Sequence, residues 1–537
     1  MTLESVTSGF HPIAVLLLMS FSTTVYYYHL EASKHALNPL PDTGALLLLL
    51  STPPLINALI FLLLLTFYNL HLHPLSSFPD PLLHRALPLS YIPHTLLGTT
   101  AHSNAALHAK YGPVVRIAPN QLSYISIAAW RDIYGVRESS SSGKDTTGGG
   151  KQMIREELVF PGDDFEFFTP AKPMISCDAA NHARHRRAVR SYEGMVSGLT
   201  RVLMGRLEEE QRRVDDVNSE LGEKEKGEGI NIVDWFHFAM FDVTSALVFG
   251  KPFGNPENGR YHDLPWSLAI AEVPGLGRLV SWFLPRKMVA EARRHMQFIV
   301  DMIDARSRAQ LAGPPHQMDF MSYILPALQV PHGEKPTAAS LSTEELYLNA
   351  QLLCIAGSET TASLLAGTVY FLSLEENAHH RARLVAELRG QFAAPEDMTP
   401  TTLAHEAPFL GAVLNECLRL YPPGAINMPR KVPAGGAMID VPGGSVVGIA
   451  QFAACRSATH WIDPLRFAPE RWLMEGEQAK YACDRKDVFR PFSHGPRNCA
   501  GQSLAVAECR LIVARLFSSH WAAAEHAVHV SRTRRRI

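Results

Sequence analysis

One cysteine, Cys499, lies between a loop rich in glycine and proline and a segment whose apolar residues have helical spacing, in the stretch PFSHGPRNCAGQSLA (residues 491–505). The free N–H groups and the dipole at the start of a helix favour an anion. Arg497, two residues earlier, adds positive charge. The pattern therefore predicts a stabilised thiolate, which serves as a metal ligand or as a nucleophile.

Three kinds of chemistry are open to such a thiolate. A zinc site needs three or four ligands, and only His494 and Cys509 lie nearby, at spacings that suit zinc poorly. A cysteine nucleophile needs a positioned base, which the sequence does not exclude. A haem iron needs only one protein ligand, because the porphyrin supplies four nitrogens. The other six cysteines are scattered, mostly in apolar runs, so the sequence favours a reducing compartment over a disulfide framework.

The segment FSHGPRNCAG (residues 492–501) resembles the haem-binding signature of the cytochrome P-450 monooxygenases. Five positions match the family pattern: Phe492, Gly495, Arg497, Cys499 and Gly501. The resemblance implies that Cys499 is the axial ligand of haem b (iron protoporphyrin IX) and that Arg497 pairs with a haem propionate. It also implies that Phe492 covers the sulfur and that the two glycines let the backbone approach the porphyrin.

Two upstream motifs resemble the same family in the expected order. ECLR (residues 416–419) places Glu416 and Arg419 on one side of a helix, and FAPERW (residues 467–472) supplies Arg471. A Glu–Arg pair at this spacing is usually a surface feature when it stands alone. Together with the cysteine segment, the resemblance implies a buried structural triad of Glu416, Arg419 and Arg471 that holds the cysteine loop.

A third match lies inside a long apolar pattern, residues 341–374, which predicts one buried helix. Its segment AGSETTAS (residues 356–363) resembles the family's oxygen-activation segment. The resemblance implies two catalytic residues: Thr360, which contacts dioxygen or its water, and Glu359, which supplies protons. It also implies that Gly357 lets the helix open. Without that context, a mid-helix threonine can simply hydrogen-bond to the carbonyl one turn earlier.

Further basic residues are candidates for binding the haem propionates. In HARHRRAVR (residues 182–190), His182 and Arg186 have the spacing that some members use, although many members carry a tryptophan in place of the histidine. The alternative is a basic, solvated helix, whose other arginines could face an acidic electron donor. Arg430, in MPRKVP (residues 428–433), is a further propionate candidate.

The first 71 residues predict a membrane anchor region with one or two hydrophobic segments. Residues 44–68 contain no charge over 25 positions, which is long enough to cross a bilayer. Residues 13–28 are shorter and form a second span or an interfacial helix. A cleaved signal peptide is the alternative, but the usual basic segment is missing before the first apolar run, which favours a retained anchor.

The rest of the chain predicts a mainly α-helical fold with small β-sheets. Residues 111–126 alternate as a pair of strands does. The resemblance implies the cytochrome P-450 fold for a haem-thiolate catalytic domain at residues 72–517, with haem between the long central helix and the cysteine loop. Residues 518–537 (SSHWAAAEHAVHVSRTRRRI) depart from the family pattern and predict a disordered tail.

The resemblance implies a membrane-anchored monooxygenase that inserts one oxygen atom of O2 into an apolar small molecule. The likeness is strongest to fungal secondary-metabolism members, in particular isotrichodermin-type terpenoid hydroxylases. The implied electron source is NADPH through NADPH–cytochrome P-450 reductase, at the endoplasmic reticulum membrane with the catalytic domain facing the cytoplasm. The net charge of −2 indicates no nucleic-acid partner.

Two alternative functions remain open at this stage. The first is a haem-binding protein whose catalysis is impaired by a truncated carboxyl-terminus. The second keeps the fold but performs dehydration or rearrangement without dioxygen, and the intact pair of Glu359 and Thr360 argues against it.

Overall fold

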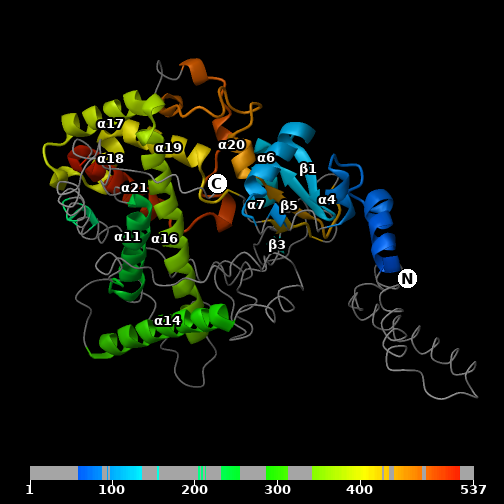
Figure 1. Ribbon diagram of the computed structural model, residues 1–537, viewed down its shortest axis with the longest axis horizontal. Helices are drawn as coiled ribbons and strands as arrows, with labels where there is room; N and C mark the ends of the chain where they lie inside the picture. Colours follow the sequence, from blue (N-terminus) through cyan, green and yellow to red (C-terminus); the bar gives the residue numbers. More distant parts are fainter. Residues whose placement is uncertain are drawn as a thin grey trace, which may run out of the picture. The chain divides into compact units, whose positions relative to one another are not determined.

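The computed structural model describes residues 59–87, 93–94, 97–135, 154–155, 203–205, 207, 209, 212, 231–253, 286–312, 342–425, 429–433, 441–473 and 479–520 (Figure 1). The chain divides into two compact units. One comprises Met1–Tyr91 with Arg116–Asn120, and the other comprises Ile92–Val115 with Gln121–Ile537.

The first unit contains an apolar helix, Leu59–Leu72, whose last turn, Tyr68–Leu72, is π-helical, and a short helix α4, Leu82–Ala86. Several side chains of Leu59–Leu72 are exposed, including Leu63 and Leu64. They form the described end of the predicted 44–68 segment, whereas residues 13–28 lie outside the described residues. Within this unit, Asp80 forms an ion pair with Arg85 at 2.8 Å.

Within the described residues, two helices are long and apolar enough to cross a membrane, Ile232–Phe249 (α11) and Thr343–Ser373 (α16), whereas Leu59–Leu72 is shorter. Much of each lies buried in the second unit, so they serve as core helices there. The helix α16 confirms the sequence prediction for residues 341–374. A capping box fixes its start, because Ser342 Oγ accepts from the Glu345 N–H and the Glu345 carboxylate accepts from the Ser342 N–H.

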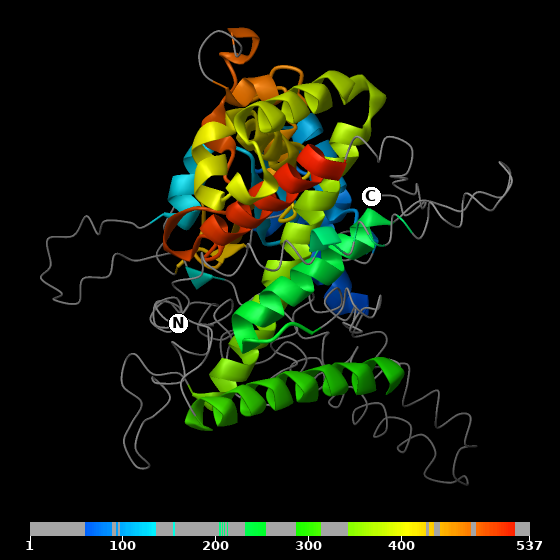
Figure 2. The ribbon, with the colours of Figure 1, turned by 90° about the vertical axis from the view of Figure 1, so that its left-hand side faces the viewer.

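Two helices, α11 and α14 (Arg286–Ala312), pack on the amino-terminal half of α16. Helix α11 lies along α16, and α14 crosses near its amino-terminal end (Figure 2). Apolar residues of all three, among them Phe249, Ile299 and Leu346, form a shared cluster. This packing holds the amino-terminal half of α16 in place.

The other end of α16 joins a second group of helices: α17 (Ala378–Gln391), α18 (Pro400–Glu406), α19 (Pro408–Leu420) and α21 (Gln502–Arg515). Their apolar side chains form the largest core cluster of the described residues. The carboxylate of Glu387 on α17 accepts hydrogen bonds from the Phe409 and Leu410 N–H groups, so it caps the start of α19.

Four strands of a small mixed sheet lie in the second unit, in the order β2-β5-β4-β3. The pairing of β2 with β5 is parallel, and the pairings of β4 with β5 and with β3 are antiparallel. The predicted strand pair at residues 111–126 is present as β1 and β2. The strands and flanking helices are α6 (Thr100–Tyr111), β1 (Val114–Ala118), β2 (Gln121–Tyr124), α7 (Ile127–Tyr134), β3 (Ile154–Arg155), β4 (Arg430–Lys431), β5 (Val446–Ile449) and α20 (Gln451–Cys455).

Short helical turns make up most of the remaining described chain. The 3-10 turns are Glu375–Asn377, Pro395–Asp397, Pro469–Trp472, Ala479–Tyr481, Lys486–Val488 and Gly495–Arg497, and a π-helical turn, Leu516–His520, follows α21. The predicted tail, residues 518–537, lies mostly outside the described residues. The mostly helical architecture with a small mixed sheet agrees with the predicted fold class.

A buried carboxyl group, Glu508, lies on α21, and desolvation raises its pKa to about 8. At pH values between its ordinary pKa and this raised pKa, Glu508 keeps its proton in the folded protein but loses it in the unfolded chain. The free energy of unfolding therefore falls as pH rises through this window, by about 1.4 kcal/mol per pH unit.

We expect Glu508→Gln to remove this pH dependence. The stability of the variant relative to the parent should increase by about 2.7 kcal/mol between about pH 5.5 and about pH 7.5, since other titrating groups cancel in the comparison. Urea unfolding of both proteins at the two pH values measures this change. An equal stability difference at both pH values would show that Glu508 titrates normally in the folded protein.

Candidate active site

The cysteine loop leads directly into α21. Cys499 donates its backbone N–H to the Phe492 carbonyl at 2.9 Å, and Asn498 donates to the Gly495 carbonyl at 3.1 Å. Gly501 is the N-cap of α21, so Cys499 lies two residues before the N-cap, next to a helix start as the sequence predicts. The Cys499 side chain is exposed.

The other described cysteines differ from Cys499 in environment. Four are buried, and burial raises the pKa of the Cys417 and Cys455 thiols to about 12 and raises those of Cys354 and Cys509 as well. These thiols stay protonated at neutral pH and are poor metal ligands. Of the described cysteines, only Cys483 shares the exposure of Cys499.

A glycine is required at position 495. Its φ is +77°, and a Cβ there would lie 2.0 Å from the Tyr134 carbonyl oxygen at the end of α7. Helix α7 also holds the turn Lys486–Val488, because the Trp130 indole N–H donates to the Val488 carbonyl at 3.0 Å. By contrast, a Cβ at Gly501 would meet no described atom within 4 Å. The loop thus takes its shape from close contact with α7.

Two arginines come together beside this loop. Arg430, on β4, is almost fully buried, and its guanidinium lies 4.8 Å from the centre of the Tyr134 ring. Burial lowers the pKa of Arg430 to about 10, and the nearby positive charge of Arg497 acts in the same direction. Two adjacent cations in a desolvated setting suit an anionic ligand such as a carboxylate.

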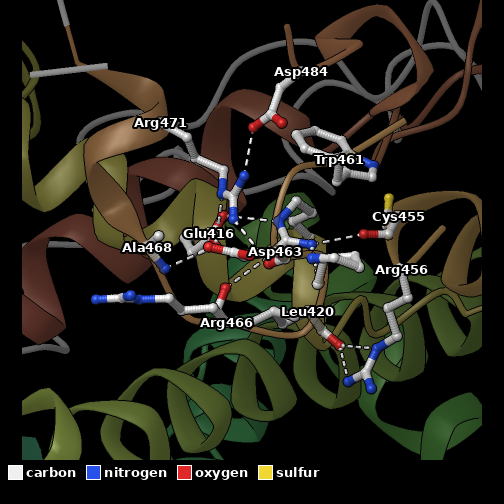
Figure 3. Close-up of polar contacts among 12 residues, drawn as sticks. Glu416, Leu420, Cys455, Arg456, Trp461, Asp463, Arg466, Ala468, Arg471 and Asp484 are labelled. Carbon is white, nitrogen blue, oxygen red and sulfur yellow. Dashed lines mark hydrogen bonds and ion pairs between the residues drawn. The ribbon is translucent and has the colours of Figure 1, made fainter. Parts of the chain in front are cut away.

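The predicted triad is present and completely buried (Figure 3). Arg419 donates through Nε and Nη2 to the two carboxylate oxygens of Glu416, at 2.9 and 2.7 Å. Arg471 donates from Nε to the same carboxylate at 3.0 Å. The structure therefore brings together all three residues that the sequence singles out.

The network extends beyond the triad through partners that the sequence does not indicate. The second carboxylate in it, Asp484, pairs with Arg471, and its other oxygen accepts from the Ile462 N–H at 2.7 Å (Figure 3). The Trp472 indole N–H and the Ala468 N–H also donate to Glu416. Trp472 stands in the FAPERW motif, but nothing near Asp484 in the sequence marks its role.

The predicted catalytic residues lie on α16. The Thr360 hydroxyl donates to the Ala356 carbonyl at 2.6 Å, one turn earlier. The Glu359 carboxylate is 46% exposed and lies 3.6 Å from Nδ1 of His237 on α11, a neighbour that the sequence analysis missed.

At Gly357 the structure differs from the expectation. The chain stays α-helical there, and a Cβ would lie 3.1 Å from the Thr244 side chain of α11. Glycine at this position therefore allows close packing between two helices. The two remaining candidates, His182 and Arg186, lie outside the described residues.

Comparisons with known proteins agree with this arrangement. The family model for Cytochrome P450 matches residues 91–520. The chain belongs to the cytochrome P450 family. It is 35% identical to the cytochrome P450 monooxygenase aclL of Aspergillus oryzae over 85% of this chain and 89% of that protein. It is 34% identical to ABA2 of Pyricularia oryzae, covering 83% of this chain and 84% of the relative.

As a P450, the chain is an oxidoreductase that uses a haem iron, a redox partner and a small-molecule substrate. The described residues fit that cofactor. One accessible cysteine at a helix start can give a single axial thiolate. The buried Arg430 and the partly buried Arg497 nearby can pair with the carboxylates of a haem.

We expect Gly495→Ala to prevent normal haem loading. The left-handed φ alone costs roughly 1–2 kcal/mol for a non-glycine residue, and the Cβ also collides with the Tyr134 carbonyl. The ratio of haem absorbance to protein absorbance should fall roughly tenfold. Gly390→Ala on α17, where a Cβ meets nothing within 4 Å, is the matched control. Full haem occupancy in Gly495→Ala would show that the loop can adopt another conformation.

Proposed function

We propose that this P450 is a membrane-anchored haem-thiolate monooxygenase whose cofactor is haem b, held by the Cys499 sulfur. The observation that carries this assignment is the accessible cysteine at the start of α21. It lies near the buried Arg430 and the partly buried Arg497, and it differs from the buried, protonated thiols. Phe492, which packs against the main core, is assigned to cover the sulfur. Arg497 and Arg430 pair with the propionates, and we assign the same function to His182 and Arg186.

Bound haem supplies the activation of dioxygen and the insertion of one oxygen atom into the substrate. The residues of α16 supply the proton. Thr360 already donates its hydroxyl hydrogen to the Ala356 carbonyl, so its oxygen is free to accept a hydrogen bond from water or from a protonated carboxyl group. Glu359, which is partly exposed, exchanges protons with solvent and passes them toward Thr360 Oγ1.

The substrate that we propose is an apolar fungal secondary metabolite such as a terpenoid, and the electrons come from NADPH through NADPH–cytochrome P450 reductase. The similarity to monooxygenases from several fungi supports this choice. Eukaryotic P450 enzymes are usually bound to the endoplasmic reticulum membrane. The exposed apolar side chains of Leu59–Leu72 are consistent with an anchor there, with the catalytic domain in the cytoplasm.

The carbon monoxide difference spectrum of the reduced protein tests the assignment of Cys499. We expect the strongly red-shifted Soret band of thiolate ligation in the parent protein and its loss in Cys499→Ala. Cys483→Ala is the matched control, because Cys483 is the other exposed cysteine of the described residues. An unchanged spectrum in Cys499→Ala would show that another atom binds the iron.

We expect Thr360→Ala to retain haem but to uncouple NADPH consumption from product formation. Product per NADPH should fall roughly tenfold, with a matching rise in hydrogen peroxide, because the oxygen that accepts the proton is removed. Thr368→Ala is the control, since Thr368 makes the same backbone hydrogen bond on α16. If Thr360→Ala forms as much product per NADPH as the parent protein, the proposed role of Thr360 is wrong. If the haem-loaded parent protein forms no product, the result favours the alternative of a haem-binding protein with impaired catalysis.

A further inference from the structure

Two histidines and a carboxylate meet between α17 and the turn Pro469–Trp472. His379 and His380 open α17, and Glu470 lies in the turn next to Arg471 of the triad. One ligand atom from each of the three residues lies within 4.8 Å of the others. His380 Nδ1 is 3.3 Å from Glu470 Oε1, and the two imidazole rings have centroids 3.8 Å apart.

The orientation of the His380 ring is fixed before any ligand binds. Its side chain is 2% exposed, packs edge-on against Phe467 and lies tilted against Phe409. The ring also hydrogen-bonds to the backbone of Phe467. Histidines that bind metals are usually held by such a bond to a backbone group, which sets the ring orientation. Burial also lowers the pKa of His380.

The distances suit a tetrahedral ion. Zinc bonds to histidine and carboxylate of about 2.0–2.2 Å place neighbouring ligand atoms about 3.3–3.5 Å apart. The separation of His380 and Glu470 already has this value. His379 is exposed, so its side chain can rotate to close the remaining gap, and Glu470 is 28% exposed, which leaves a path for the ion and for a water as fourth ligand.

We propose that His379, His380 and Glu470 bind one Zn²⁺ ion, which ties α17 to the turn that carries Arg471. Two imidazoles and one carboxylate are a donor set that zinc uses in proteins. The nearby charge of Arg466 and the positive end of α17 oppose a cation, so the expected affinity is modest. The site joins α17 to the turn Pro469–Trp472 only in the folded protein, and bound zinc should therefore stabilise the folded protein.

Zinc titration of the haem-loaded full chain, without a polyhistidine tag and after treatment with a chelator, tests this proposal. Calorimetry should show one zinc ion bound per chain at this site, and a saturating concentration should raise the thermal midpoint by roughly 3 °C. Neither measurement needs substrate or reductase, so the result is independent of the proposed monooxygenase activity.

Variants separate this site from other binding. His380→Ala and Glu470→Gln should abolish both effects, and His379→Ala, at an exposed position that the fold does not need, should weaken zinc binding at least tenfold. His405→Ala, an exposed histidine on α18, should bind zinc as the parent does. Absence of zinc binding by the parent, or equal binding by His379→Ala and the parent, would overturn the proposal.

Discussion

The Glu416 carboxylate is the constraint on which the described architecture around the cysteine depends. It lies fully buried and accepts hydrogen bonds from two arginines, an indole and a backbone amide. With Asp484, it balances the charges of Arg419 and Arg471. Removal of one partner from such a network leaves an uncompensated buried charge and costs about 3–5 kcal/mol. The four charges therefore have to be assembled together.

This network organises a part of the chain that has little regular structure of its own. Between α20 and the cysteine, the described residues form short turns, and side chains rather than strands connect them. Arg419 also donates hydrogen bonds to three backbone carbonyls, those of Cys455, Pro464 and Arg466. The Trp472 ring packs against Phe489, with 4.7 Å between the ring centres. The residue before Phe489, Val488, accepts a hydrogen bond from the Trp130 indole through its carbonyl. The position of the cysteine loop follows from these contacts.

The sequence predicts the parts of this arrangement that have a local pattern. The spacing of apolar residues predicts α16 almost to its ends, and three short motifs predict the triad and the cysteine at a helix start. The contacts that define the loop are different, because the Tyr134 carbonyl and Gly495 are separated by hundreds of residues. Asp484 is only 13 residues from Arg471, but no local motif marks it as a partner. Gly357 is misread as an opening in the helix, because its contact is with Thr244 on a distant helix, α11.

Charge connects the binding of the cofactor to the folding of this region. Burial lowers the pKa of Arg430, and repulsion by the nearby charge of Arg497 lowers it further. Under the proposed assignment, the propionates of haem offset both positive charges, and the Cys499 thiolate is formed where the helix start stabilises it. Cofactor binding then offsets the repulsion between the two arginines in the folded chain. Haem binding should therefore stabilise the folded loop. The buried thiols cannot compete, because each must first lose a proton in an apolar environment.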